Sequence, residues 1–352
     1  MIHNGKFLRD QARLGLRVVK IAAACALAAM SLLSAKPARA GQLGADIIAL
    51  FPKEVGEFAY ADLKKARTMK WFPQLQEQML PERFRQFEKF LASAGVDPNT
   101  QVEELAWGLV AEGVDNKKDG AGSSAVPTGE NIVGIALGNY NPETTEAYFK
   151  KQKLPTFKAR NYTLYAFGSG SGANDLFFFF IDSSTAAFGH RSLLEKMIEV
   201  RFGTEDGLQR NEKFFPLVNE ANGSGVVWAV LNPAYTRLAM KQLAPEINQF
   251  PDAAKLVQRM QNMLINVDAG SGLDGKFQAV CGSVEDANSL GQLLQMGLLY
   301  KQYQAKTENP DMAQLLTQAS VTPSGDRIVV RMNLTDDQMT SLIRRNTFAF
   351  KL

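Results

Sequence analysis

Residues 57–63 read EFAYADL, a strand pattern that runs directly into a helical segment at 64–67. Residues 225–231 read GVVWAVL and run into a helix opened by Asn232 and Pro233. Asparagine accepts a hydrogen bond from an unpaired backbone N–H at a helix start, and proline has no N–H to leave unpaired. Because a similar series of elements follows each strand, the sequence predicts two divergent copies of one pattern.

The two copies share the same predicted order of elements after their first strands. A long helix comes first, at 81–91 and at 252–264, and its apolar residues recur at helical spacing. Two strands, a second helix, two returning strands and a closing helix follow. The predicted strands are 104–111, 131–137, 163–167 and 176–181 in the first copy, and 264–267, 276–281, 319–322 and 327–332 in the second. The later helices are predicted to open at 141–143 and 283–286 and to close the copies at 191–200 and 336–345, the last with a capping box of Thr335 and Gln338.

The order β-α-β-β-α-β, with one added strand and helix, predicts an α+β fold. We expect two tandem divergent ferredoxin-like (split βαβ) lobes whose antiparallel sheets pack helices on one face. The expected divisions are a signal peptide at 1–40, an N-terminal linker at 41–55, a first lobe at 56–203, a linker at 204–222 and a second lobe at 223–352. Within the first lobe, the Gly-, Ser- and Lys-rich segment 115–129 is predicted to be a mobile loop.

The first forty residues have the pattern of a secretory signal peptide. Five basic residues between Lys6 and Lys20 precede the apolar run Ile21–Leu33, and Ala38-Arg39-Ala40 has the form of a signal-peptidase site. The run of 13 residues is short of the roughly 20 that span a bilayer. Cleavage after Ala40 therefore predicts a protein of the periplasm or cell surface without a transmembrane span. Retention of the leader as an anchor, and lipidation at Cys25, are the alternatives.

Removal of the leader reverses the net charge of the chain. The basic residues fall from 39 to 32 and the acidic ones from 36 to 35, which changes the formal charge from +3 to −3. Nucleic-acid binding needs clustered lysine and arginine, so no nucleic-acid partner is expected. Cys281 and His190 would be the sole cysteine and histidine remaining, too few for a disulfide or for the usual zinc site. We expect no cofactor, although an all-oxygen calcium site stays open.

Two glycine-rich segments resemble catalytic motifs in their letters only. Residues 270–275 fit G-x-G-x-x-G, but a strand pattern follows where nucleotide binding requires a helix, so a hairpin turn is predicted. Residues 168–172 place Gly170 where a nucleophile elbow requires serine. His190 is the one candidate base for a hydrolase, and it is expected to have a structural role. Paired acids such as Glu103 and Glu104 give no sign of converging on a cleft.

Phenylalanine provides the candidate contacts with a partner or an apolar ligand. The run Phe177–Phe180 places aromatic rings on both faces of a strand, so both faces must be covered. Phe84 and Phe87 share one face of the predicted helix 81–91. Phe84, Phe87, Phe178 and Phe179 are therefore the candidate contact residues. Burial in the core, or between lobes, is the alternative for each of them.

Three segments carry a family resemblance. The strand at 58–63, the Val96-Asp97-Pro98 segment before Leu105-Ala106-Trp107-Gly108, and the segment Phe188–Leu193 before a helix resemble uncharacterised exported bacterial proteins with a duplicated α+β body. The resemblance covers most of residues 50–350. It implies a fold and an export route, and it supplies no catalytic residues.

The leading hypothesis is an exported, non-catalytic binding or scaffold protein with an unknown protein partner. It depends on the leader, the duplicated pattern, the 22 phenylalanines and the scarcity of catalytic residue types. A carrier of a lipid or other apolar ligand is the second hypothesis, since such ligands occupy apolar pockets. A hydrolase that uses His190 is the third.

Overall fold

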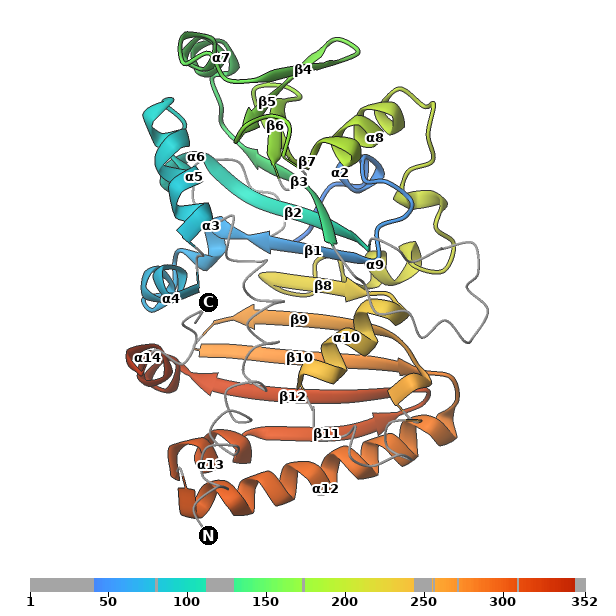
Figure 1. Cartoon of the computed structure of the whole chain (residues 1–352). Coiled ribbons are helices and arrows are strands. Elements are labelled where there is room, and N and C mark those ends of the chain that lie inside the picture. Colours follow the sequence, from blue (N-terminus) through green and yellow to red (C-terminus); the bar gives the residue numbers. More distant parts are fainter. Residues whose placement is uncertain are drawn as a thin grey trace.

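The computed structural model describes residues 41–79, 82–111, 130–172, 175–243, 255, 257–270, 272–308 and 310–345. Twelve strands of this part of the chain form one sheet in the order β11-β12-β10-β9-β8-β1-β2-β3-β7-β6-β5-β4 (Figure 1). Every pairing between neighbouring strands is antiparallel. The strands are β1 (Glu57–Asp62), β2 (Val102–Ala111), β3 (Glu130–Gly138), β4 (Thr156–Ala159), β5 (Tyr162–Phe167), β6 (Leu176–Phe180), β7 (Thr185–His190), β8 (Val227–Leu231), β9 (Met260–Ala269), β10 (Gly272–Cys281), β11 (Ala319–Ser324) and β12 (Arg327–Thr335).

The two strands quoted at the outset meet in the middle of this sheet. β1 and β8 pair with Ala59 opposite Ala229 and Tyr60 opposite Trp228. The rings of Tyr60 and Trp228 stack with centroids 5.4 Å apart. Both side chains are fully buried. This pairing joins the two halves of the chain into one continuous sheet.

Helices cover both faces of the sheet. The helices are α2 (Ala45–Ala49), α3 (Leu63–Ala66), α4 (Phe72–Met79), α5 (Glu82–Ser93), α6 (Pro98–Gln101), α7 (Pro142–Lys151), α8 (Arg191–Arg201), η2 (Leu208–Arg210), α9 (Phe215–Ala221), α10 (Pro233–Leu243), α12 (Val284–Glu308), α13 (Pro310–Thr317) and α14 (Asp336–Arg344). One core cluster includes buried residues of α3, α10, α12 and α14, and the other includes those of α2, α8 and α9. We call these two sides of the sheet the α12 face and the α8 face.

Alternation along the strands explains the two cores. In β1, Phe58 and Tyr60 belong to the core of the α8 face, whereas Ala59 and Ala61 belong to that of the α12 face. Successive side chains of a strand point to opposite faces, so a central strand covered on both sides is apolar throughout. The prediction that helices lie on one face is therefore wrong for the part of the sheet around β1.

The last three strands behave differently. On β10, β12 and β11, the residues that alternate with the buried ones are largely polar, among them Lys276, Arg331 and Thr322. Antiparallel sheets often have one covered and one solvated face. The expected arrangement of helices on one face thus holds at this end, where the α12 face is covered and the α8 face is polar.

The mixed α+β class and the antiparallel sheet are confirmed, but the split βαβ pairing is wrong. In a βαβ unit the strands on either side of the helix run parallel. Here β1 and β2 lie on either side of α3–α6, yet they pair antiparallel with Tyr60 opposite Ala106. The predicted order lacks β4 and β7 of the first half, and the predicted pairing fails because element order alone does not specify which strands become neighbours.

The second predicted long helix is also partly wrong. Met260, Met263 and Leu264 were placed on a helix, whereas they lie in strand β9. Met263 belongs to the core of the α12 face and Leu264 to that of the α8 face. Such a doubly covered strand has a continuous apolar run that helical spacing fits equally well over a few residues.

Most predicted helix starts are confirmed by their hydrogen bonds. The Oδ1 atom of Asn141 accepts from Thr144 N, and that of Asn232 accepts from Tyr235 N, at 3.1 Å each. Thr335 and Gln338 form the predicted capping box at the start of α14. The signal peptide and the loop 115–129 lie outside the described residues.

Candidate interaction surface on helix α12

Helix α12 is the longest described helix and lies along the outer edge of the sheet, beside the terminal strand β11 (Figure 1). Its start follows the predicted pattern, because Ser283 Oγ accepts from Asp286 N at 3.1 Å. Asp286 also pairs with Arg259 at 2.7 Å. The sequence at 283–286 therefore fixes where this helix begins.

The inner side of α12 is fastened to the sheet. Ala287 and Leu290 are buried in the core of the α12 face. The side-chain amide of Gln295 donates to Val321 O of β11 at 2.7 Å. At Gly291 a Cβ atom would lie 2.6 Å from the ring of Pro323, so glycine permits the close approach of helix and strand. These contacts determine which side of the helix points outward.

The outward side carries four large apolar residues that form a contiguous stripe. Met296, Leu299, Tyr300 and Tyr303 are spaced i, i+3, i+4 and i+7, so they lie on one side of the helix. Each of them is 60–73% exposed. We call these four residues the α12 stripe. Scattered exposed apolar residues are ordinary, but a contiguous group marks an interaction site.

The charges around the stripe are few and of one sign. Between Asp286 and Glu308, α12 contains no acidic residue, and its two charged residues are Lys301 and Lys306. Both lysines are exposed. The remaining polar residues of this stretch are mostly glutamines, and Gln304 donates to the hydroxyl of Tyr300 at 2.9 Å.

The structure places the four phenylalanines proposed from the sequence elsewhere. Phe178 and Phe179 are buried on opposite faces of the sheet, one in each core. Their side chains thus present no surface to a partner, in agreement with the alternative of burial. Phe84 and Phe87 lie in α5, but their side chains are outside the described part of the chain.

His190 has a structural contact in the sheet. Its Nδ1 atom accepts a hydrogen bond from Ile132 N at 2.9 Å, across from β7 to β3. This residue stands at the N-cap position of α8, although its side chain does not cap the helix. Because Nδ1 accepts from the backbone, the neutral imidazole has its proton on Nε2. Neither ring nitrogen is then available to take a proton from a nucleophile, so this geometry does not favour the hydrolase hypothesis.

The two glycine-rich segments are hairpin turns. Gly270 lies between β9 and β10, and Gly272 is the first residue of β10. Next to this turn Leu273 pairs with Ala269. Gly168–Gly172 lies in the connection between β5 and β6.

Within the described residues no group of histidine, cysteine and acidic side chains could hold a metal ion. Burial raises the pKa of the Cys281 thiol to about 11.

One acidic residue from the sequence analysis has a perturbed environment. Glu104 lies on β2, and its Oε2 atom accepts from the hydroxyl of buried Tyr60 at 2.9 Å. Burial raises the pKa of the Glu104 carboxyl, and the hydrogen bond from Tyr60 acts in the opposite direction. Asp62, opposite Glu104 on β1, adds to the rise through its charge.

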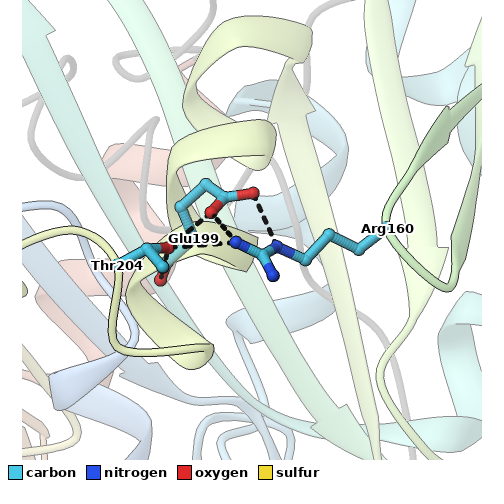
Figure 2. A network of polar contacts seen from close by, with 3 residues as sticks. All are labelled: Arg160, Glu199 and Thr204. Atoms are coloured by element: carbon cyan, nitrogen blue, oxygen red, sulfur yellow. Dashed lines mark hydrogen bonds and ion pairs between the residues drawn. The ribbon is translucent and has the colours of Figure 1, made fainter.

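An exposed polar network ties the β4–β5 hairpin to α8. Figure 2 shows Arg160, in the turn between β4 and β5, directed at Glu199 of α8, with Thr204 beside them. Arg160 Nε donates to Glu199 Oε1 at 2.8 Å. Hydrogen bonds from Arg160 and Thr204 lower the pKa of Glu199 to about 2. The guanidinium also lies over the ring of Phe202, 4.7 Å from its centroid. These contacts fasten the β4–β5 hairpin to α8.

Comparisons with known proteins add structural similarity alone. No protein-family model matches the chain, and no curated protein matches it. Crystal form III of TP0453 superposes with a TM-score of 0.49 at 11% sequence identity, covering 86% of this chain and 99% of TP0453. For crystal form I the TM-score is 0.48 at 11% identity, with 88% and 100% covered. Function therefore has to be inferred from the residues of this chain.

The α12 stripe was not found from the sequence, although a signal was present. The helix start at 283–286 was predicted, but the apolar residues beyond it were not assigned to two sides. Between 287 and 307 apolar residues occur all around the helix and acids are absent. A helix that is apolar on all sides is normally covered on all sides. Only the structure shows which side lacks a cover within the described residues.

Among the described residues no helix is long and apolar enough to cross a membrane.

Proposed function

We propose that this chain is an exported, non-catalytic binding protein of the periplasm or cell surface that docks through the α12 stripe. The observation that carries this proposal is the exposure of Met296, Leu299, Tyr300 and Tyr303 on one side of a helix whose other side is anchored to the sheet. Aromatic residues and methionine are typical of binding surfaces. The export signal predicted at 1–40 supports the location.

The structure also supports a duplicated origin of the body. Outward from the β1–β8 pair, the first half has the strand order β1-β2-β3-β7-β6-β5-β4 and the second half has β8-β9-β10-β12-β11, so the first five positions correspond. Helices follow the first and third strands of both series, and a helix closes each. On this proposal the halves 56–203 and 223–352 are repeats joined through β1 and β8, with 204–222 as the connection.

A carrier of an apolar ligand is less well supported. A carrier encloses its ligand in a pocket that buries most of the ligand surface. The residues of the α12 stripe are instead exposed, and α12 lies along the edge of the sheet (Figure 1). It suits contact with an extended surface better than enclosure of a small molecule.

Site-specific crosslinking in the host cell tests the proposed docking. The photoreactive amino acid p-benzoylphenylalanine replaces Tyr303 in one variant and Thr322, an exposed residue of β11, in a matched control. We expect crosslinked products from position 303 and none from position 322. Products with neither protein nor lipid at either position, or equal products at both, would contradict docking through the stripe.

A further inference from the structure

We infer that the α12 stripe docks on the surface of a lipid bilayer that carries anionic headgroups. This inference rests on the proposed function, since it names the partner of the same surface. The stripe lies on the outermost helix at the β11 edge of the sheet (Figure 1). A flat surface can therefore reach the stripe.

The side chains of the stripe suit the boundary between headgroups and acyl chains. Tyrosine has an apolar ring and a polar hydroxyl, and this combination places it at the membrane–water interface. Leu299 and Met296 provide purely apolar groups beside Tyr300 and Tyr303. An interfacial helix buries such a side by a few ångströms while its polar residues stay in water.

Charge distinguishes a bilayer from a second copy of this chain. Within the stretch 287–307 the charged residue beside the stripe is Lys306, three residues after Tyr303. Anionic headgroups provide the opposite charge for lysines next to an interfacial helix. The same stretch of a second copy has no acidic residue to offer.

The extent of the stripe also argues against self-association. Its four residues expose roughly 500 Å², if a large side chain offers about 200 Å², whereas a stable interface takes about 800 Å² from each partner. The stripe from Met296 to Tyr303 covers two helical turns. Helix pairing of the coiled-coil type is sustained over about three or four heptads. A bilayer sets no such minimum, because it surrounds whatever apolar surface is inserted.

Vesicle flotation tests this inference on protein recovered from the envelope fraction of the host. The probes are vesicles of phosphatidylcholine alone and vesicles that also contain phosphatidylglycerol. We expect the double variant Leu299→Gln/Tyr303→Gln to bind the anionic vesicles at least about tenfold more weakly than the wild type, because it removes apolar surface from the inserted side.

The lysines provide the second arm of the test. We expect Lys306→Gln to weaken binding to anionic vesicles by roughly fivefold, with less effect on neutral vesicles, and Lys301→Gln, on another side of the helix, to weaken it less. The matched control is Lys276→Gln/Arg331→Gln, which removes two cations from the polar side of β10 and β12. This control is expected to bind like the wild type. Equal losses in the control and the α12 variants would overturn the specific role of α12.

The remaining outcomes separate the lipid inference from the proposed function. Absence of wild-type binding to both kinds of vesicle overturns the lipid inference. If sedimentation then shows a dimer that Leu299→Gln/Tyr303→Gln dissociates, the stripe is a docking surface for a second copy and the proposed function stands. Both proposals are wrong if Leu299→Gln/Tyr303→Gln changes neither vesicle binding nor the oligomeric state, and if position 303 gives no crosslinked product.

Discussion

Two buried tryptophans of the central strands differ in one hydrogen bond. Trp228 Nε1 donates to Gly41 O at 3.1 Å, whereas Trp107 Nε1 has no hydrogen-bond partner among the described residues. Trp228→Phe removes a bond and leaves the carbonyl of Gly41 unpaired, so it is expected to destabilise the protein by about 1 kcal/mol more than Trp107→Phe. Urea unfolding of the two variants measures the difference. Equal losses would mean that the bond to Gly41 contributes nothing.

The buried carboxyl of Glu104 makes the stability depend on pH in a defined direction. Because its pKa is raised in the folded protein, the folded state binds the proton more tightly than the unfolded state. Stability is therefore expected to fall as the pH rises from the ordinary value of about 4.3 through the folded pKa.

Glu104→Gln removes this dependence and keeps an acceptor for the Tyr60 hydroxyl. We expect the variant to gain stability relative to the wild type at about pH 8, and to lose this advantage at about pH 3, where the carboxyl is largely neutral in both states. Urea unfolding at the two pH values measures the change. The control is Glu205→Gln at an exposed position, which removes the same charge without touching the pair of Tyr60 and Glu104. A difference in stability between Glu104→Gln and the wild type that is the same at both pH values would contradict the raised pKa of Glu104.

At the scale of the element, α12 separates stability from binding. Leu290 is 1% exposed and packs on the sheet, whereas Leu299 is 64% exposed in the stripe. Leu290→Ala is expected to cost about 2–5 kcal/mol, and Leu299→Ala less than about 0.5 kcal/mol. Thermal or urea unfolding measures both values. A large loss for Leu299→Ala would mean that the outer side of α12 is covered within the protein itself.

At the scale of the whole molecule, one sheet joins both halves of the chain. β1 and β8 each lie between two neighbouring strands, and the pair buries Tyr60 against Trp228. We therefore expect a single unfolding transition in which circular dichroism and tryptophan fluorescence coincide. Trp107 reports on the first half, whereas Trp71, which donates to Asp336 of α14, and Trp228, which stacks on Tyr60, report on contacts between the halves. Two separated transitions would show that the halves unfold independently.

The sequence by itself determined those features whose causes are local. Alternation and length indicated β1, β2, β3, β5, β6, β11 and β12. The helix starts at Asn141, Asn232 and Thr335 were predicted because a capping side chain bonds to backbone only two or three residues away. The glycine turns followed from the strand patterns on either side. The leader at 1–40 remains a prediction from its charge and apolar pattern.

Only the tertiary structure decided which strands are neighbours and which apolar residues stay exposed. The antiparallel pairing of β1 with β2 and β8 depends on contacts between residues distant in sequence, which no local pattern specifies. Phe178 and Tyr303 are both aromatic, yet one is buried in a core and the other lies in the α12 stripe. An apolar side chain favours burial equally in either place, and the packing of the whole chain determines which residue receives a cover.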